Sequence, residues 1–348
     1  MKSISTVSWA KPGTLRFLGA GLLGFALMFA ADVASAGPHQ RPDHPAAPAF
    51  AFNPTTPAKT KLGCRLFFDH RLSKANDTSC ASCHDPAHGW TDTRRKSRGA
   101  LDVAEARRTQ TVLGAGFVPK LGWSGGIDAL EGFVLAPIAR AHEMAQDLDA
   151  LVVELSSSGD YSRGLEAAFG SSEVTVGRIS QALAAFVRTL VPGVAPFDRW
   201  QAGDQNAVSD SAKEGFDLFT GKAGCAACHT GWRFTGDAFH DIGLEAGSDI
   251  GRAVHEPNNP LARYAFKTPT LRDVALRPPY MHDGSKSDLM DVVDHYVQPK
   301  PARESLSPLL SSPVLSDREK LNLVDFLLTL TSVTDHTFKN CLPERKQK

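Results

Sequence analysis

The sequence has no excess of charge of either sign. It contains 38 Lys and Arg residues and 38 Asp and Glu residues among 348 residues, so its formal net charge is zero. This balance excludes a strongly basic nucleic-acid-binding protein and gives no electrostatic reason to expect attachment to a membrane surface. The length indicates about two domains, and an apolar content of 42% is enough to build real hydrophobic cores.

Long apolar runs are missing after the first 36 residues. Residues 17–31 form an uncharged apolar stretch of 15 residues, shorter than the about 20 residues that a membrane-spanning helix needs. A basic segment precedes this stretch and a small-x-small pattern ending at Ala36 follows it, as in a secretory signal peptide; an uncleaved membrane anchor is the alternative. We expect a signal peptide at 1–36, a flexible Pro- and Ala-rich leader at 37–57, and an exported protein without a membrane span.

Extended strand patterns are missing as well. No long run alternates between apolar and polar residues, so a large β-sheet is not expected. Helical periodicity predicts a helix over 173–190, another over 210–219, and a third that Ser316 opens with a capping box and that runs to about residue 330. The fold class is therefore mainly α. The Pro- and Gly-rich segment 192–203 is the best candidate for a domain junction.

Six cysteines and twelve histidines are the chemically informative residues. Four cysteines and two histidines form two C-x-x-C-H motifs, which are Cys80, Cys83 and His84 in the first and Cys225, Cys228 and His229 in the second. In this motif two thiols bind the vinyl groups of one c-type haem, and the adjacent His ligates its iron. A thioredoxin-like pair leaves the His unexplained, and a shared zinc site has to join motifs 145 residues apart. The sequence predicts two covalent haems, with His84 and His229 as iron ligands.

A weak internal repeat accompanies the two motifs. Residues 63–67 and 215–219 both read G-x-x-L-F, which we interpret as the start of a helix shortly before each haem motif. The repeat predicts two cytochrome c-like domains with one haem each. We expect these domains at residues 58–200 and 201–340, before a tail at 341–348. The two remaining cysteines, Cys64 and Cys341, either pair in an oxidising compartment or remain two partly buried thiols.

The second iron has several candidate ligands on the side opposite His229. They are His240, His255, Met281, His282, Met290, His295 and Tyr296. Ser287 is suited to cap a helix running to about residue 297, whose apolar face carries Leu289, Val292, Val293 and Tyr296. This stripe points Tyr296 inward and turns His295 away. Periodicity alone favours a core tyrosine whose hydroxyl is bonded to a carbonyl.

The first iron has no comparable candidate. The loop 85–129 contains no Met and only one His, His88, which lies four residues after His84 and is too close to cross to the opposite face. An open axial position allows peroxide or oxygen to bind, whereas two filled positions favour electron transfer. We therefore expect a reactive haem in the first domain and a six-coordinate haem in the second.

Several longer motifs resemble the di-haem cytochrome c peroxidase/MauG superfamily over nearly all of the mature chain. Besides the haem motifs they are Leu66-Phe67-Phe68-Asp69, Arg71-Leu72-Ser73, Phe239-His240-Asp241-Ile242-Gly243, Lys267-Thr268-Pro269-Thr270-Leu271-Arg272 and Pro279-Tyr280-Met281-His282-Asp283-Gly284. Tyr296 falls where the peroxidases have a Met ligand and the MauG branch has Tyr. The switchable His of the peroxidases falls near Leu101, where this chain has none. Both positions favour the MauG branch.

The resemblance implies a periplasmic di-haem oxidoreductase. Members of the MauG branch use hydrogen peroxide to form a high-valent di-haem state. They then oxidise tryptophans of the methylamine dehydrogenase precursor and complete its tryptophan tryptophylquinone cofactor. One alternative is a di-haem peroxidase that takes electrons from a small protein such as a cytochrome c or a cupredoxin. Another is a non-enzymatic di-haem electron carrier.

The resemblance also assigns roles to single residues. Trp123 matches the tryptophan that relays electrons between the haems, and Glu143 matches the acid/base beside the first haem. A calcium ion between the haems is implied, with Thr109 in place of the family's asparagine ligand and with the carbonyls of Arg277 and Pro279. Two positions depart from the pattern: Phe133 replaces a glutamine near the first haem, and Ala223 replaces a surface tryptophan on the route to the partner.

Overall fold

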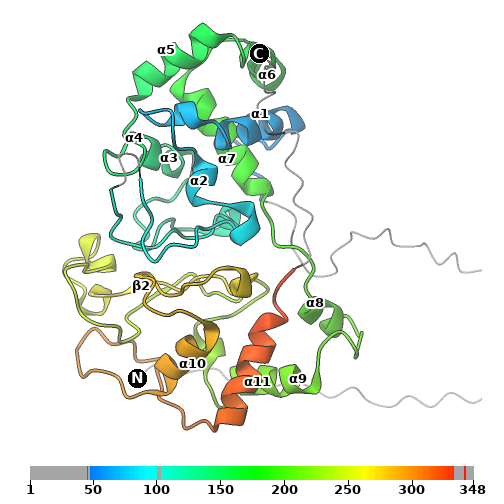
Figure 1. Cartoon of the computed structure of the whole chain (residues 1–348), viewed down its shortest axis with the longest axis vertical. Coiled ribbons are helices and arrows are strands. Elements are labelled where there is room, and N and C mark those ends of the chain that lie inside the picture. The colour runs from blue at the N-terminus through cyan, green and yellow to red at the C-terminus, as the bar shows by residue number, and fades with distance from the viewer. Residues whose placement is uncertain (1–44, 46–47, 100–102, 333–340, 342–348) are drawn as a thin grey trace, which may run out of the picture. The chain divides into compact units, whose positions relative to one another are not determined.

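The computed structural model describes residues 45, 48–99, 103–332 and 341 (Figure 1). The signal peptide expected at 1–36, its cleavage site near Ala36, residues 37–44 and 46–47 of the leader, Leu101 and most of the tail lie outside these residues. Within the described part of the chain, no helix has the length and apolar character needed to cross a membrane.

Helices provide most of the regular structure, as the sequence predicts. The first half of the described chain, up to residue 195, contains α1 (Pro57–Phe67), α2 (Cys80–Cys83), α3 (Leu130–Phe133), α4 (Ala136–Ala139), α5 (Leu148–Ser158), α6 (Ser162–Phe169) and α7 (Val176–Thr189). The second half, residues 196–332, contains α8 (Pro196–Gln201), α9 (Asp210–Thr220), α10 (Leu289–Val297) and α11 (Asp317–Leu328). Two short strands, β1 (Phe239–His240) and β2 (Phe266–Lys267), form an antiparallel pair. The three helices predicted by periodicity are confirmed as α7, α9 and α11, the last with the expected capping box at Ser316.

Each half is built around two helices that cross at a glycine. α1 packs on α7, and α9 packs on α11 (Figure 1). A Cβ atom added to Gly63 would overlap the backbone carbonyl of Ala182, and one added to Gly215 would overlap the carbonyl of Asn322. The backbones approach this closely only because glycine has no side chain. Both glycines lie near the middle of their helices, so the G-x-x-L-F segments end α1 and α9 and do not begin them, which corrects the sequence interpretation.

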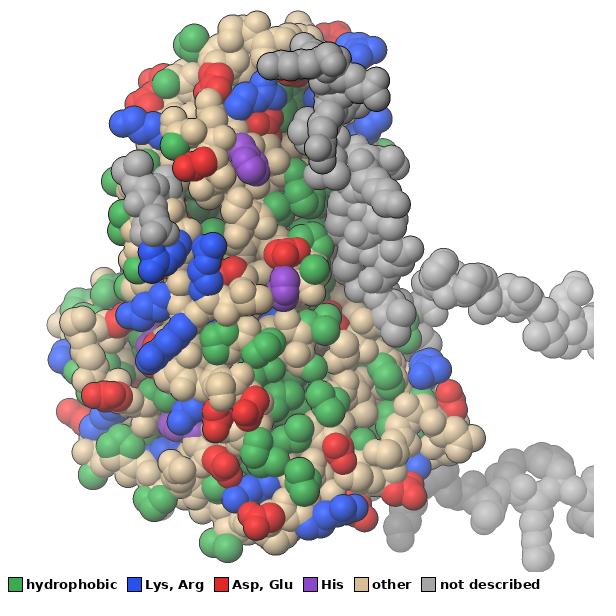
Figure 2. All heavy atoms as spheres, in the orientation of Figure 1, with side chains coloured by type: hydrophobic (Ala, Val, Ile, Leu, Met, Phe, Trp, Pro, Cys, Tyr) green, Lys and Arg blue, Asp and Glu red, His purple; other side chains and the backbone are tan. Residues whose placement is uncertain are grey.

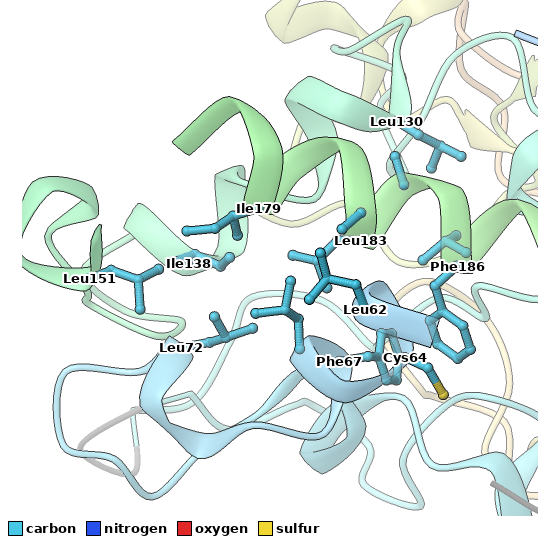
Figure 3. Packing of buried hydrophobic residues seen from close by; sticks show 14 of the residues in the cluster. Leu62, Cys64, Phe67, Leu72, Leu130, Ile138, Leu151, Ile179, Leu183 and Phe186 are labelled. Carbon is cyan, nitrogen blue, oxygen red and sulfur yellow. The ribbon is translucent and has the colours of Figure 1, made fainter. Parts of the chain in front are cut away.

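The two helix pairs enclose separate hydrophobic cores. In the first, Leu62 and Phe67 of α1 face Leu183 and Phe186 of α7 (Figure 3). The second core includes Phe197 of α8, whose ring centroid lies 5.7 Å from that of Phe326. Because α8 packs in the second core, the second half begins before residue 201, where we expected it.

The chain is anchored to the first core at both ends of the described part. Asn53 is buried, and its Nδ2 donates hydrogen bonds to Glu131 Oε1 at 2.8 Å and to the carbonyl of Gln181 at 2.9 Å. The end of the leader expected to be flexible up to residue 57 is therefore fixed by these bonds. At the other end, Cys64 of α1 and Cys341 form a disulfide, with their Cα atoms 5.2 Å apart.

Candidate functional site

The two C-x-x-C-H motifs line one cavity. The first motif forms α2, and the second begins with the short 3-10 helix Cys225–Ala227, so a helical turn brings the two cysteines of each motif to one side. All four cysteines, together with His84 and His229, line a mostly apolar cavity of about 1050 Å³. Sites for one small molecule have volumes of about 300–1,000 Å³, so this cavity has room for more than one ordinary ligand.

Burial raises the pKa of all four cysteines of the motifs. Burial raises the pKa of Cys80 and of Cys225 to about 12, and burial raises the pKa of Cys83 to about 11. A redox-active dithiol has a lowered pKa, because only the thiolate reacts. These four thiols therefore do not fit a thioredoxin-like pair. Their place on an apolar wall suits covalent attachment of a large apolar group such as haem.

Each motif histidine is oriented by a backbone carbonyl. His84 Nδ1 lies 3.2 Å from the carbonyl oxygen of Trp90, and His229 Nδ1 lies 2.8 Å from that of Phe234. Trp90 and Phe234 both have positive φ values, +63° and +52°, which turn the chain back toward the histidine. Burial lowers the pKa of His84 and lowers that of His229 to about 4, so both rings are neutral. A neutral imidazole held through one nitrogen is the usual arrangement of a metal ligand.

The helix α10 brings Tyr296 to the cavity. Tyr296 lines the cavity wall with the stripe that the sequence predicts, Leu289, Val292 and Val293. Burial raises the pKa of Tyr296, and the negative charges that Cys225 and Cys228 can carry raise it further. The phenol therefore lies within electrostatic reach of the second motif. A nearby metal cation would reverse this effect and favour the phenolate.

One detail of α10 differs from the prediction, and one goes beyond it. The N-cap is Asp288, whose Oδ1 accepts a hydrogen bond of 2.8 Å from the backbone N–H of Asp291, and not Ser287. His295 is not part of the cavity wall, but it is buried and not turned to solvent. Its Nε2 lies 2.9 Å from the carbonyl oxygen of Ile242, and this partner allows a polar side chain to be buried.

Glu143 lies on the cavity wall near the first motif. Its Oε1 accepts a hydrogen bond of 2.7 Å from Arg140 Nη1. Glu105 and His142 stand beside it, and one ligand atom of each of the three side chains lies within 4.8 Å of the others. Burial raises the pKa of Glu105, whose Oε1 has no hydrogen-bond partner among the described residues. Sequence reasoning missed Glu105, because a lone glutamate in a loop carries no signal.

Trp123 lies where the two halves meet. Its indole Nε1 donates a hydrogen bond of 2.7 Å to the carbonyl of Arg108 in the first half. Its own carbonyl accepts one of 2.9 Å from the backbone N–H of Lys267 in the second half. The ring centroid lies 6.4 Å from that of His282, and Trp123 lines the same cavity as both motifs. The indole is thus fixed between the two motif regions.

The expected calcium position holds a guanidinium group. Arg108 donates hydrogen bonds to the carbonyls of Arg277 at 3.0 Å and Pro278 at 2.9 Å, and to that of Thr109 at 3.0 Å. The Thr109 hydroxyl pairs with the hydroxyl of Ser97. Arg108 therefore already occupies the Arg277 carbonyl, which is one of the two carbonyls expected to bind calcium, and the carbonyl of Pro278 next to the other, so a positive group stands where the calcium ion would bind and these residues do not fit that ion. This arrangement disagrees with the calcium site that the resemblance implies at Thr109, Arg277 and Pro279.

Comparisons with known proteins agree with this geometry. The sequence pattern of the di-haem cytochrome c peroxidase family matches residues 57–206. The chain is 48% identical to the methylamine utilization protein MauG of Methylorubrum extorquens, over 80% of this chain and 79% of that protein. It is 46% identical to the protein of the same name from Methylophilus methylotrophus, over 84% and 87%. A crystal structure of a MauG-like protein associated with microbial copper homeostasis superposes with a TM-score of 0.77 and 29% identity, covering 84% of this chain and 94% of that chain.

Proposed function

The chain belongs to the di-haem cytochrome c peroxidase/MauG family and is a haem-dependent oxidoreductase that uses peroxide, and on this premise we propose that it matures a protein-derived cofactor. The cysteines of the two motifs would hold two covalent haems, and His84 and His229 would be their iron ligands. With hydrogen peroxide, the enzyme oxidises tryptophans of the methylamine dehydrogenase precursor and completes tryptophan tryptophylquinone. The names of two relatives that are 46–48% identical support this assignment.

The position of Tyr296 is the observation that carries the proposal. Its phenol lies on the cavity wall in electrostatic reach of Cys225 and Cys228, where it would serve as a ligand to the iron of a haem bound at the second motif. An anionic oxygen ligand favours oxidised iron, whereas a Met thioether raises the reduction potential. This chain therefore favours storing oxidising equivalents over accepting electrons from a donor.

At the first motif the chain handles protons. Bound haem would supply the redox chemistry with peroxide, and the chain supplies the acid/base. Glu143 takes the proton of the bound peroxide on a carboxylate oxygen and returns it to the leaving oxygen. Arg140, at 2.7 Å, holds that carboxylate in place. Glu105 stands beside this carboxylate, and burial raises its pKa, which favours its holding a proton next to Glu143.

With haem bound at both motifs, Trp123 would lie on the route of electrons between them. Its indole is fixed by the carbonyl of Arg108 and lies on the wall of the shared cavity. A rigid aromatic side chain in this place shortens the distance over which an electron has to move.

A basic segment near the first motif supports docking of a protein partner. Arg94, Arg95, Lys96 and Arg98 are all exposed, although the whole chain is neutral. Figure 2 shows Lys and Arg side chains gathered on one face of the molecule. Such a patch steers an acidic partner, either the precursor or a small electron-donor protein. Ala223 is half-buried and replaces the surface tryptophan of the family, so the electron route to the partner differs here.

We also propose that the protein is exported to the periplasm, where cytochromes c are assembled, and that residues 1–36 are removed. Mass spectrometry of the periplasmic fraction tests both points. We expect a mature chain beginning near Gly37, with a mass increased by two haems. A mass without haem, or a retained N-terminus, would contradict them.

A reconstitution assay tests the proposed activity. The holoenzyme is mixed with the methylamine dehydrogenase precursor and hydrogen peroxide, and formation of the quinone is followed by absorbance. We expect turnover by the wild type, loss of it in Tyr296→Met, and no change in Tyr264→Phe, a matched variant of a tyrosine outside the cavity. Wild-type enzyme that leaves the precursor unmodified would refute the proposal.

The second candidate is a di-haem peroxidase that reduces hydrogen peroxide with electrons from a cytochrome c or a cupredoxin. The family pattern over residues 57–206, which carries that description, favours it. Rapid oxidation of a reduced cytochrome c by peroxide, without modification of the precursor, would establish this function. A third possibility, an electron carrier without enzyme activity, is excluded by the family to which the chain belongs.

A further inference from the structure

A buried guanidinium group joins the two halves of the chain. Arg108 is only 5% exposed. Its Nη2 donates hydrogen bonds to the carbonyls of Asp92, Arg277 and Pro278 at 3.0, 3.0 and 2.9 Å, and its Nη1 donates one to that of Thr109 at 3.0 Å. Two of these carbonyls belong to the first half and two to the second. The cluster is therefore a cross-link made of one cation and four backbone oxygens.

Converging backbone carbonyls are the kind of ligand that a hard cation such as calcium binds. A guanidinium group keeps its positive charge at all physiological pH values and has five N–H donors in a fixed plane, so it can serve several carbonyls at once. In this structure the Arg108 side chain fills the place between the carbonyls. No room is left there for a metal ion bound to the same oxygens.

The charge around the cluster is balanced as well. The carboxylate of Asp92 is buried, at 7% exposure, and neither of its oxygens has a hydrogen-bond partner among the described residues. Burial lowers the pKa of Arg108, and the negative charge of Asp92 opposes that effect. One buried anion and one buried cation compensate each other. A divalent ion added to this pair would leave an excess of positive charge in a region shielded from water.

We propose that the Arg108 guanidinium is a built-in cation that replaces a metal ion at the boundary of the two halves. The same residue also binds the indole of Trp123 through its backbone carbonyl. Arg108 is therefore a positioning residue, which fixes both the boundary and the tryptophan on it. A direct consequence is that electron transfer between the haem sites of this chain needs no calcium ion, and that calcium chelators leave these sites unchanged.

The metal content of the holoprotein tests this inference. Protein purified in the presence of calcium is gel-filtered and analysed by mass spectrometry of elements, before and after treatment with EGTA. We expect iron but no stoichiometric calcium, and optical and EPR spectra that EGTA leaves unchanged. About one calcium per chain, removed by EGTA together with a change in the spectra, would overturn the proposal.

Variants test the exchange of one cation for another. Arg108→Asn offers an amide oxygen in place of the guanidinium, so we expect it to bind calcium in a calorimetric titration and to melt at a higher temperature with calcium than with EGTA. Arg178→Asn is the control, because Arg178 also donates to a carbonyl, that of Glu173, but on the surface of the first half. It should respond to neither. Arg108→Asn that folds but shows no response to calcium would contradict the proposal.

Arg108→Lys covers the case in which the asparagine variant does not fold. Lysine keeps the positive charge but has fewer donors, so this variant should be less stable than the wild type and still insensitive to calcium and EGTA. Calcium-dependent stability in Arg108→Lys would show that the charge at this place does not exclude the metal ion. That result would also overturn the proposal, independently of the activity of the enzyme.

Discussion

Replacing Gly215 by alanine would separate the two helices that hold the second motif. The added Cβ would lie 2.6 Å from the carbonyl carbon of Asn322 and 2.9 Å from the Cβ of Phe326. Non-bonded carbon atoms prefer about 3.5–4.0 Å, so α9 has to move from α11 by on the order of 1 Å. Overpacking of this kind costs about 1–3 kcal/mol. It opposes the gain of about 1 kcal/mol that the same substitution makes at an unhindered helix position.

We expect a net loss near 2 kcal/mol, because a gap of about 1 Å also weakens the contacts of the phenylalanines around Phe326. For a unit of this size the loss corresponds to a melting temperature lower by about 4–8 °C. The matched control is Gly177→Ala in α7, where the nearest atom to an added Cβ is Thr175 Oγ1 at 4.0 Å. This control should be neutral or slightly stabilising.

Thermal unfolding of the two holoproteins, followed by far-UV circular dichroism and by the haem absorbance, measures both effects. If Gly215→Ala melts at or above the temperature of Gly177→Ala, the helices do not cross in contact at Gly215. The same reasoning applies to Gly63 in the first half. Equal losses of stability in Gly63→Ala and Gly215→Ala would show that the two halves repeat the same helix packing.

Two further predictions concern the first half. Tyr161 donates a hydrogen bond of 2.6 Å to Asp69, so Tyr161→Phe should destabilise the protein at neutral pH by about 1.5–3 kcal/mol, as measured by urea unfolding. Burial alone raises the pKa of Asp69, but the hydrogen bonds from Arg71 and Tyr161 outweigh burial and lower it. The stability that Asp69 contributes is therefore present above its unfolded pKa and is lost as the pH falls through its folded pKa. Because Tyr161→Phe removes one of these bonds, this loss of stability should move to higher pH. An unchanged acid limb would contradict that reasoning. Glu143→Gln should slow the reaction with peroxide by about 10²–10⁴-fold in stopped-flow absorbance, whereas Glu105→Gln should slow it less; a larger effect of Glu105→Gln would exchange the two roles.

The elements with strong local signals could be predicted from the sequence. The stripe on α10 placed Tyr296 on the inner face, because apolar residues at helical spacing have to face a core. Each C-x-x-C-H motif could be recognised because its two cysteines and its histidine lie close together in the sequence. These features depend on spacing within about ten residues, which a sequence displays directly.

Features that depend on distant residues could not be predicted. Arg108 would be placed at the surface by composition rules, since arginine is rarely buried unless it is paired. Its carbonyl partners at residues 277 and 278 are about 170 positions away, and only the fold brings them together. His295 was turned away from the cavity as expected, but its burial against Ile242 depends on a contact across 53 residues. The glycines at the helix crossings carry no sign of their close contacts either.

The most direct test of the account is the EPR spectrum of the resting ferric holoprotein in the wild type and in Tyr296→Phe. The account predicts one high-spin haem with an open position at the first motif and one low-spin haem at the second. In Tyr296→Phe the low-spin signal should be replaced, whereas Tyr264→Phe should leave the spectrum unchanged. A low-spin signal that persists in Tyr296→Phe would show that another residue binds the second iron, and it would contradict the proposed function at its main support.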